Sequence, residues 1–569
     1  MGVKNWKCAG SNLESEIFSV QQKYSLPRPV AMFLVARGIS GESVAEFLEP
    51  RLGNLSDPYR FPGIQDACAR LWRAIADHEP ILIHGDYDTD GITASALLAW
   101  VLAQNGAVVH SFIPHRFDDG YGFTPESLEK ALEANGHCPV LVTVDCGITS
   151  CDAVESATAR GIDVIVTDHH EAGQELPKAL AVINAKVYPE LKDLELLSGA
   201  GVAFKLSHAF IKYGREHNLG GFQTHLEEVL DFVALGTVAD IVPLQGENRV
   251  MVKYGIDALR RQVRPGVRAL IESSRLHNDL TPADITFRLA PRINAAGRVG
   301  DANVALELLE SEHIVEAYGC AAKLESYNRI RQEKEQEIYQ EAKEQIDRNL
   351  AWQSPFSLLV AGRDWHQGVI GIVASRLARD YNRPTIVLTI QGDEAYGSGR
   401  SVARLNLVEV LSRTSHLLDR FGGHPMAVGI GLRTERIADF FEAMDREIRT
   451  QIKVEDLENF ISYDGEAFLN EMTPTFFEYL TRLAPFGHCN QKPLFRFNDL
   501  RVEHCGAVGG GMHTRGVLQS RNGQIDFIAF NHPPAEFYRR TIDVLATPQM
   551  NTHMGRNIPQ LNVVDFREV

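Results

Sequence analysis

Three short segments of the sequence carry carboxylates and imidazoles at spacings that suit metal binding. The first, HGDYDTDG from His84 to Gly91, places one histidine and three aspartates directly after an apolar run. Asp145 ends the next apolar run, and the triplet DHH from Asp168 to His170 ends the one after that. Carboxylate oxygens bind hard divalent cations, and Mn²⁺ also accepts imidazole. A charged surface loop would explain any one segment, but three similar segments together indicate a metal centre.

Asp240, in the segment LGTVADIVPL, is a fourth candidate ligand. An unpaired carboxylate in so apolar a setting is costly, although a helix-end cap or a salt bridge would also explain it. A single zinc ion would normally take three or four nitrogen or sulfur ligands, so a carboxylate-rich set favours Mg²⁺ or Mn²⁺. Two such ions can activate water and neutralise a phosphoryl group during in-line attack. The sequence therefore predicts a two-metal phosphoesterase.

These segments recur in a pattern that predicts how they are positioned. From Ile81 onward, short apolar runs alternate with helix-like stretches, as in ILIHGDYDTDG, VLVTVDCGI, DVIVTDHHE and ALAVINAK. This pattern is typical of a parallel α/β domain. Ligands bind at the carboxyl ends of the strands in such sheets, so we expect the acidic and histidine side chains to face one cleft.

The rest of the chain predicts further domains around this one. Amphipathic helices come first, a long polar helix and a second α/β unit follow the catalytic domain, and short β-like stretches end the chain. The expected boundaries are an N-terminal cap at 1–75, the catalytic domain at 76–310, the connecting helix at 311–350, the second α/β domain at 351–454 and a small barrel at 455–569.

The amino-acid composition limits which classes of protein this chain can belong to. The chain has 569 residues, of which 44% are hydrophobic and 23% charged, as expected for a folded multidomain enzyme. We find no run of about 20 apolar residues and no signal-peptide pattern, so a cytoplasmic location without membrane contact is expected. The eight cysteines include no CxxC pair and are expected to be reduced thiols.

The charge is unevenly distributed along the chain. A net charge of -17 argues against nucleic-acid binding, because affinity for phosphate backbones comes from Lys and Arg. From Leu480 onward, however, ten basic residues stand against seven acidic ones. A local basic surface on an acidic protein is therefore compatible with the sequence.

The order of the motifs resembles that of the DHH phosphoesterase superfamily: HxxxDxD, a strand-end Asp, DHH and a later Asp. The segments GSGRS and GGHPMAVG resemble the DHH-associated domain, and APFGHCNQKPLF resembles the opening of the nucleic-acid-binding barrel of the RecJ family. The implied fold class is α/β, with a parallel-sheet DHH catalytic domain, a long helix, a smaller α/β DHH-associated domain and a C-terminal OB-like β-barrel.

The resemblance divides the metal ligands between two ions, Mn²⁺ or Mg²⁺, that share a bridging aspartate. One ion is expected at His84, Asp88 and Asp145, and the other at Asp90, Asp145, His169 and Asp240.

Three further residues have expected roles beside the ions. Asp86 is expected to touch a metal or a water on it, and Asp168 to orient His169 from outside. His170 is expected to face the scissile phosphate and to assist protonation of the leaving group.

Two segments fit substrate binding. In APRINAAGRVGD, Arg292, Asn294 and Arg298 are suited to phosphate contacts, although an ordinary surface turn is the alternative. By resemblance, Ser398, Arg400 and Ser401 of GSGRS form the pocket for the 5′-terminal phosphate.

Two other segments carry less specific signals. Gly423 and His424 of FGGHP are expected to approach the same cleft, although a tight structural turn explains the glycines equally well. In the barrel, aromatic side chains are expected mostly in the core, with some available to stack on DNA bases; the candidates are Phe486, Phe495, Phe497 and Phe530. The segment HCNQKP departs from the glycine-rich spacing of the family.

The resemblance implies a metal-dependent exonuclease that degrades single-stranded DNA from 5′ to 3′, releases 5′-mononucleotides and serves DNA repair and recombination. Helicases and a single-strand-binding protein are candidate partners, and a monomer is expected. A DHH enzyme for small substrates is the nearest alternative, which the barrel and the N-terminal cap disfavour. A non-catalytic DNA-binding scaffold would have lost metal ligands, and this sequence keeps the full set.

Overall fold

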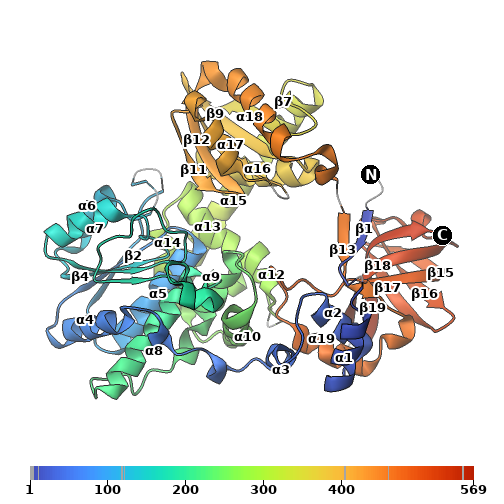
Figure 1. Ribbon diagram of the computed structural model, residues 1–569, viewed down its shortest axis with the longest axis horizontal. Helices are drawn as coiled ribbons and strands as arrows, with labels where there is room; N and C mark the ends of the chain where they lie inside the picture. The colour runs from blue at the N-terminus through green and yellow to red at the C-terminus, as the bar shows by residue number, and fades with distance from the viewer. Residues whose placement is uncertain are drawn as a thin grey trace. The chain divides into compact units, whose positions relative to one another are not determined.

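The computed structural model describes residues 5–10, 12–116, 119–120, 122–277, 279–402, 405–458, 460–553 and 556–569 (Figure 1). The chain folds into two compact units. The larger unit comprises Ser56–Val242 and Gly246–Asn459, and the smaller comprises Met1–Leu55, Pro243–Gln245 and Phe460–Val569.

The first lobe of the larger unit is built on a five-stranded parallel sheet with the order β3-β2-β4-β5-β6. The strands β2 and β4 are buried along their whole length, which explains why they read as continuous apolar runs rather than as alternating ones. The strands are β2 (Ile81–Gly85), β3 (Val109–Phe112), β4 (Val140–Val144), β5 (Asp163–Thr167) and β6 (Ala181–Ile183).

Helices surround this sheet and extend the lobe. Local signals set their starts: Asp88 caps α5, and α6 begins with a Thr124–Ser127 capping box followed by proline. The helices are α4 (Ile64–Ala76), α5 (Thr89–Gln104), α6 (Pro125–Asn135), α7 (Cys151–Ala159), α8 (Gly199–Glu216), α9 (Leu230–Ala239), α10 (Gly246–Arg261), α11 (Pro265–Ser273), α12 (Pro282–Asp284), the π-helix η6 (Ile285–Leu289), α13 (Ala290–Val299) and α14 (Asn303–Glu310).

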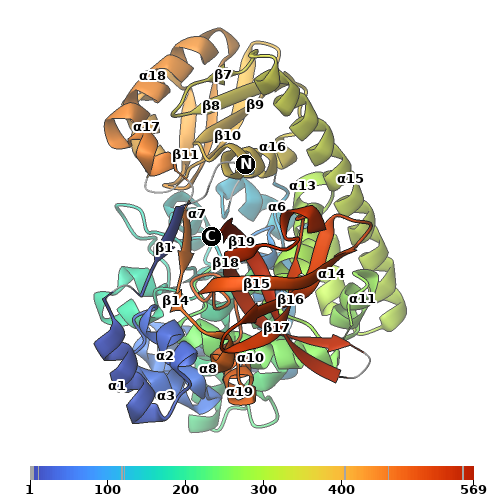
Figure 2. The same cartoon turned by 90° about the vertical axis from the view of Figure 1, so that its right-hand side faces the viewer.

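A helix of 34 residues, α15 (Ile314–Asp347), leads from the first lobe to the second. Figure 2 shows it running from the helices beside α11 and α14 to the sheet of the second lobe. Its first half packs on α11, α13 and α14, and its second half packs on α16 (Gln367–Tyr381). The other sides of the helix are polar, as the sequence predicts for a solvated connecting helix.

The second lobe holds a six-stranded mixed sheet with the order β11-β12-β10-β9-β8-β7. The pair β8–β9 is parallel and the others are antiparallel. Apolar clusters join one face to α15 and α16, and the other face to α17 (Leu407–Arg413) and α18 (Ile437–Gln451). The strands are β7 (Trp352–Gln353), β8 (Leu358–Arg363), β9 (Thr385–Gln391), β10 (Glu394–Arg400), β11 (Arg420–His424) and β12 (Ala427–Arg433).

The smaller unit contains a closed five-stranded barrel with the order β15-β16-β17-β19-β18, which β15 and β18 close. This strand order, together with the parallel pairing of β17 with β19, is that of an OB-fold. The strands are β15 (Phe495–Val508), β16 (His513–Ser520), β17 (Gly523–Ala529), β18 (Thr541–His553) and β19 (Arg556–Glu568), with β14 (Gly465–Glu466) beside β15.

The N-terminal helices pack on this barrel. One apolar core joins α1 (Glu14–Tyr24), α2 (Arg28–Val35) and α3 (Ser43–Leu48) to the barrel and to α19 (Pro474–Leu483). The first strand, β1 (Asn5–Cys8), pairs in parallel with β13 (Phe460–Tyr463). The start of the chain therefore shares a unit with the barrel up to Leu55, whereas α4 belongs to the larger unit.

The predicted fold class is confirmed: a parallel-sheet domain, a long helix, a second α/β domain and an OB barrel follow one another along the chain. The exact domain boundaries stay a prediction. No helix within the described ranges has both the length and the apolar character that crossing a membrane requires.

Candidate metal centre

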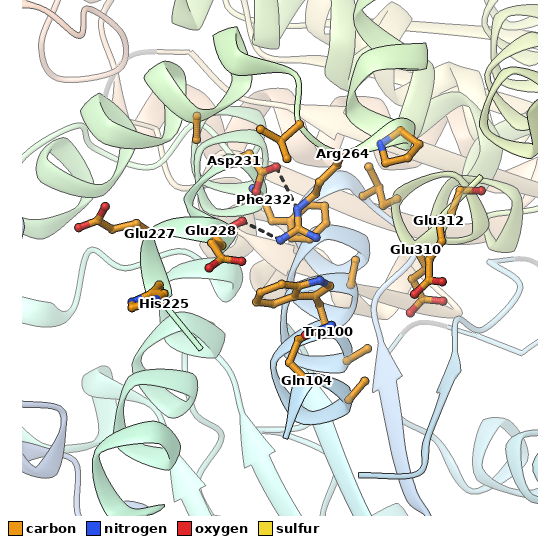
Figure 3. Close-up of a pocket in the computed structure, with 18 of the residues that line it drawn as sticks. Trp100, Gln104, His225, Glu227, Glu228, Asp231, Phe232, Arg264, Glu310 and Glu312 are labelled. Carbon is orange, nitrogen blue, oxygen red and sulfur yellow. Dashed lines mark hydrogen bonds and ion pairs between the residues drawn. The ribbon is translucent and has the colours of Figure 1, made fainter. Parts of the chain in front are cut away.

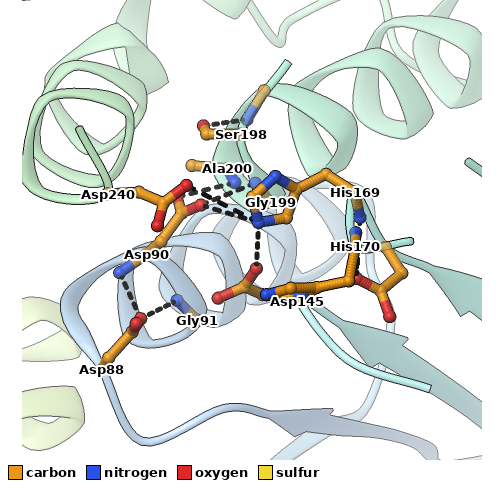
Figure 4. Close-up of polar contacts among 12 residues, drawn as sticks. Asp88, Asp90, Gly91, Asp145, His169, His170, Ser198, Gly199, Ala200 and Asp240 are labelled. Atoms are coloured by element: carbon orange, nitrogen blue, oxygen red, sulfur yellow. Dashed lines mark hydrogen bonds and ion pairs between the residues drawn. The ribbon is translucent and has the colours of Figure 1, made fainter. Parts of the chain in front are cut away.

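Most of the predicted ligands meet at the carboxyl edge of the parallel sheet in the first lobe, and Figure 4 shows Asp88, Asp90, Asp145, His169 and Asp240 there. Asp86 follows β2, Asp145 follows β4 and Asp168 follows β5, so adjacent parallel strands deliver them to one edge. The backbone at Asp145 has a φ of 60°, a sharp turn that the N–H of Asp145 secures by donating to the carbonyl of Thr167 at 3.0 Å. Sheet topology and this turn therefore bring distant segments together.

Ligand atoms converge in three overlapping groups, and within each group they all lie within 4.8 Å of one another. Asp145 and His169 each occur in two of the groups, which makes them the links between neighbouring cation positions. The groups are Asp86, Asp88 and Asp145; Asp90, His169 and Asp240; and Asp145, His169 and His170.

The ring of His169 lies at the centre of the second group. Its Nε2 is 3.1 Å from Asp145 Oδ1, 3.6 Å from Asp240 Oδ2 and 4.0 Å from Asp90 Oδ2. Burial, and then the charge of His170, lower the pKa of His169 to about 3, so this ring is neutral. A neutral nitrogen can direct a lone pair at a cation together with these carboxylates.

The carboxylates repel one another in the protein alone. Burial, followed by the charge of Asp88, raises the pKa of Asp86 to about 8 and that of Asp90 to about 7. Burial and then Asp90 raise the pKa of Asp240 to about 9, and the pKa of Asp145 also lies well above its ordinary value. Crowding of this kind makes the ionised forms costly unless a cation compensates them.

Unsatisfied atoms provide the test of whether metal ions fit. Asp86 Oδ1, Asp145 Oδ1 and His169 Nε2 are buried and make no hydrogen bond among the described residues. Buried polar atoms are normally satisfied, so three orphaned acceptors within one cluster fit the binding of positive ions. The donor set of carboxylates and one imidazole fits Mn²⁺ or Mg²⁺.

The structure leaves His84, an expected ligand, outside all three groups. Its Nε2 lies 3.0 Å from the hydroxyl of Ser127, and its Nδ1 faces the sulfur of Cys146 at 3.9 Å. The ring is fully buried, and burial lowers its pKa to about 4. His84 thus ties β2 to neighbouring elements, whereas Asp86, two residues later, lies in one of the groups.

Asp168 serves as a hub for the DHH segment. Its Oδ1 accepts from the backbone N–H of His169 at 2.7 Å and lies 2.8 Å from Nδ1 of the His170 ring, and its Oδ2 accepts from Ile148 N at 2.9 Å. Burial acts to lower the pKa of His170, but the hydrogen bond and charge of Asp168 raise it to about 9. The ring that Asp168 orients is therefore that of His170, where the sequence suggested His169.

A second cluster in the larger unit is made of arginines. Burial, and then the charge of Arg116, lower the pKa of Arg298 to about 10 and also lower that of Arg400. No carboxylate in the described part of the chain forms an ion pair with any of the three. Arg298 Nη1 donates to the Gly368 carbonyl at 3.1 Å, which anchors the first lobe to α16 of the second. Three cations that pair with no carboxylate among the described residues form a candidate anion site.

Ser398 lies beside Arg400 in β10, against the start of α16. A Cβ on Gly371 would lie 3.1 Å from Arg400 Nη2 and 3.3 Å from Ser398 Oγ, so the glycine lets both side chains lie close to α16. The hydroxyl of Ser401, in contrast, donates to the Leu405 carbonyl at 2.7 Å and is buried. The structure therefore gives Ser401 a role within the turn after β10.

The other predicted substrate contacts in the first lobe are already engaged. Arg292 Nε donates to Glu325 of α15 at 2.6 Å, and Arg292 Nη1 donates to the Arg288 carbonyl. Asn294 Oδ1 accepts from the Thr89 N–H at 2.8 Å and from its hydroxyl at 2.9 Å. Arg292 thus fixes the connecting helix, and Asn294 fixes the loop that carries the metal ligands.

His424 of β11 lies on the second lobe and faces the centre. Its ring stacks on that of His170, with centroids 6.0 Å apart and planes 11° apart. Gly423 has a φ of 134°, and a Cβ there would lie 2.3 Å from the Ala427 carbonyl. Gly423 is therefore required by a tight turn, the alternative that the sequence left open, while His424 reaches the cleft.

The barrel aromatics divide between core and surface. Phe495 and Phe497 are buried, and Phe486 packs against Phe33 of α2. Phe530, which follows β17, is 48% exposed and contacts His513 of β16 edge to face. Of these four candidates, only Phe530 offers an open ring face.

A large pocket in the first lobe lies away from the metal ligands (Figure 3). It has a volume of about 890 Å³, and Trp100 and Phe232 form part of its wall. Two charged residues of its lining, Asp231 and Arg264, pair with each other at 3.1 Å. Other charged side chains, among them Glu228, Glu310 and Glu312, also line the pocket.

Family models match three parts of the chain. The N-terminal domain of the DHH family matches residues 80–237, the DHHA1 domain matches 355–450 and the RecJ OB domain matches 463–565. The curated single-stranded-DNA-specific exonuclease RecJ of Dickeya dadantii is 37% identical, over 95% of this chain and 94% of its own length. The chain belongs to the RecJ family.

Other RecJ proteins support this assignment. RecJ of Escherichia coli is 35% identical over 89% of both chains, and RecJ of Bacillus subtilis is 33% identical over 97% of this chain and 69% of its own. The solved structure of Thermus thermophilus RecJ in complex with Mn²⁺ has a TM-score of 0.82 at 29% identity, and it covers 99% of this chain and 79% of that one. The same enzyme solved with Mg²⁺ has a TM-score of 0.78 at 28% identity.

Two residues beside these clusters could not be predicted from the sequence of this RecJ-family chain. Arg116 lies in no motif, and only the fold brings it near Arg298 and Arg400. Gly371 lies in the ordinary-looking helical segment GVIGIVASRL, and its closeness to Arg400 and Ser398 follows from packing between segments.

Proposed function

We propose that this chain is a metal-dependent exonuclease that degrades single-stranded DNA from its 5′ end and releases 5′-mononucleotides. The observation that carries the proposal is the cluster of buried carboxylates around Asp145 and His169, whose orphaned acceptors fit two cations. The curated RecJ relatives are named single-stranded-DNA-specific exonucleases, and one was solved with Mn²⁺ and with Mg²⁺.

The three groups suggest how two ions would be held. One ion would take Asp86, Asp88 and Asp145, and the other would take Asp90, Asp145, His169 and Asp240. Compared with the ligand set expected from the sequence, Asp86 replaces His84. When bound, two ions at such a centre can activate water and neutralise the phosphoryl group under attack.

The residues beside the ions would position the reacting phosphate. His170 is oriented by Asp168 and lies beside His424, so the two rings present nitrogen atoms where a phosphodiester would approach the ions. Water would attack the phosphorus of the first internucleotide bond, and the bond from phosphorus to the 3′ oxygen of the terminal nucleotide would break. The leaving 3′ oxygen gains a proton, and the shortened strand keeps the phosphate at its new 5′ end.

The polarity of degradation would follow from the arginine cluster. Arg116, Arg298 and Arg400, with the hydroxyl of Ser398, form an anion site that suits a terminal 5′ phosphate, which carries more charge than an internal phosphodiester. A strand end bound there would place the first internucleotide bond at the ions.

The barrel would hold the rest of the strand. In OB-folds the face formed by the second and third strands binds oligonucleotides, and here those strands are β16 and β17. The exposed ring of Phe530 contacts His513 of β16, and Arg515, two residues further along β16, pairs with Asp526 of β17 at 3.4 Å. An exposed aromatic beside a cation suits stacking of bases and contact with the backbone.

A comparison of substrates tests the proposal. The full chain would be incubated with Mn²⁺ or Mg²⁺ and with single-stranded DNA, matched duplex DNA, short RNA and pyrophosphate in parallel. We expect metal-dependent release of mononucleotides from the single strand and little from the duplex. Hydrolysis of pyrophosphate or short RNA without activity on DNA would instead support a DHH enzyme for small substrates.

Three further proposals concern the partners, the oligomeric state and the location of the protein. Helicases and a single-strand-binding protein would supply the single strands that this enzyme degrades during DNA repair and recombination. The chain would act as a monomer in the cytoplasm. Light scattering of the purified chain, with and without DNA, tests the monomer.

A further inference from the structure

The N-terminus of α8 lies directly against one of the candidate metal ligands (Figure 4). The backbone N–H of Gly199 donates to Asp90 Oδ2 at 2.6 Å, and that of Ala200 donates to Asp90 Oδ1 at 2.9 Å. Both carboxylate oxygens of Asp90 are thus held by the first turn of a different helix. The partial positive charge of a helix N-terminus favours a carboxylate in this position.

Two glycines permit this contact. A Cβ on Gly199 would lie 2.5 Å from Asp145 Oδ1, and a Cβ on Gly236 of α9 would lie 2.4 Å from Asp90 Oδ1. Both distances are shorter than any tolerable contact, so α8 and α9 can approach the carboxylates only without side chains there. The approach is therefore specific to this site rather than a general feature of helix packing.

A pair of hydroxyl groups joins the two helices. Ser198 is the N-cap of α8, where its Oγ accepts from the Gly201 N–H at 3.1 Å. The same Oγ lies 2.9 Å from the hydroxyl of Thr237 in α9, and both side chains are fully buried. Thr237 comes three residues before Asp240, the ligand that ends α9. The hydroxyl pair thus connects the turn that holds Asp90 to the helix that carries Asp240.

We infer that Ser198 and Thr237 are positioning residues for the ion held by Asp90, His169 and Asp240. They fix the spacing between Asp90 and Asp240, two carboxylates that electrostatic repulsion would otherwise push apart. This inference rests on the proposed function, because it concerns one of the two proposed metal positions. In the described part of the chain, no hydrogen bond joins this hydroxyl pair to Asp86 or Asp88 of the other position.

Calorimetric titration of the full-length protein with Mn²⁺ tests the inference. In Ser198→Ala or Thr237→Val, we expect one of the two binding steps to weaken by about tenfold, the lower end for loss of an outer partner of a ligand. The other step should keep its affinity. The double variant should lose no more than Ser198→Ala alone, because that change already breaks the hydrogen bond to Thr237.

Two controls separate positioning from general destabilisation. Ser207→Ala removes another buried hydroxyl of α8, one that donates to the Ala203 carbonyl, and should leave both Mn²⁺ affinities unchanged. Thr237→Ser keeps the hydroxyl and should restore binding. At saturating Mn²⁺, turnover by Thr237→Val should approach that of the wild type, since only occupancy of the site is impaired.

Unchanged Mn²⁺ binding in both single variants would overturn the inference, as would an equal loss in Ser207→Ala. If Ser198→Ala fails to fold, Thr237→Val and Thr237→Ser still decide the outcome. A wild-type protein that binds two Mn²⁺ ions but cleaves no DNA would contradict the proposed function and leave the inference intact. A wild-type protein that binds no Mn²⁺ would overturn both.

Discussion

Two clusters of like charge lie in the larger unit, and they differ in how the fold holds them. The acidic cluster gathers five carboxylates at one edge of a parallel sheet, where backbone N–H groups and helix ends hold Asp88 and Asp90. The basic cluster gathers Arg116, Arg298 and Arg400 on long side chains from separate elements. His170 is a cation beside the acidic cluster, and no carboxylate among the described residues forms an ion pair with the three arginines.

The difference indicates what each cluster binds. Short, fixed carboxylates with orphaned oxygens suit small ions of high charge, which demand close and regular ligand geometry. Long guanidinium side chains suit a larger anion such as a terminal phosphate, whose position varies with the strand it belongs to. In the protein alone, the like charges within each cluster repel one another. Bound ligands of opposite charge would relieve this repulsion.

Removal of the shared carboxylate should have the largest effect on the acidic side of this comparison. Asp145→Ala deletes the ligand common to both proposed ion positions and should lower nucleotide release by about a thousandfold or more, because catalysis depends on charge stabilisation at that point. A release assay with single-stranded DNA at saturating Mn²⁺ measures it. Asp152→Ala, at an exposed carboxylate of α7, is the matched control. Near-normal turnover in Asp145→Ala would contradict the shared-ligand assignment.

Removal of one cation should be the next largest effect, and it should depend on the substrate end. Arg400→Ala should slow degradation of a 5′-phosphorylated strand by about ten- to a hundredfold, the value of a charge-assisted hydrogen bond, and should affect a 5′-hydroxyl strand much less. The ratio of kcat/KM for the two substrates measures this. Arg413→Ala, at a half-exposed arginine that pairs with Glu409 of α17, should leave the ratio unchanged. An equal loss on both substrates would show that Arg400 does not recognise the terminal phosphate.

The pH dependence of stability distinguishes these crowded carboxylates from carboxylates with ordinary pKa values. The folded protein without metal raises the pKa of Asp90 to about 7, of Asp86 to about 8 and of Asp240 to about 9. Groups with raised folded pKa values contribute stability at low pH and lose it as pH rises through the folded pKa. The metal-free protein should therefore lose stability between about pH 6 and 9, and Mn²⁺ should flatten this slope.

Thermal melts in a chelator and in Mn²⁺, at matched ionic strength, measure this effect. Asp86→Asn without metal should unfold at a higher temperature than the wild type at pH 8, because one repelling charge is gone. A metal-free protein whose stability rises with pH over this range would contradict the crowding of ionised carboxylates.

The smallest expected effect lies in the barrel, which carries no such cluster. Phe530→Ala should raise the KM for a long single strand by about fivefold, since stacking of one base contributes about 1 kcal/mol, and should leave kcat unchanged. Tyr538→Ala, at another exposed aromatic of the same unit, is the control. A point variant is preferable to deletion after residue 455, because α1–α3 share their apolar core with the barrel. Unchanged KM would leave the β16–β17 face without its proposed role.

The sequence predicted the larger features well for identifiable reasons. Strand ends such as Asp145 and Asp168 were predictable because β4 and β5 are continuous apolar runs, and parallel strands must deliver their carboxyl ends to one edge. The order of the motifs also indicated the OB barrel, whose five-stranded closure the structure confirms.

What the sequence did not predict depends on contacts between distant segments. His84 fits a ligand motif by spacing, but its place inside β2 turns its ring toward Ser127 of α6. Arg292 has the chemistry of a phosphate contact, yet Glu325 of α15 occupies it. The packing of α1–α3 on the barrel joins the two ends of the chain, and no local pattern reveals such a contact.

The most direct test of the central claim follows one single-stranded oligonucleotide that carries a 5′ phosphate and different dyes on its first and last nucleotides. The full chain is added with Mn²⁺, and the same mixture is run with a chelator. Immediate release of the first dye as a mononucleotide, while the second stays on a steadily shortening strand and the chelator stops both, is the predicted result. Release of the last dye first, internal cutting, or equal activity in the chelator would contradict the account.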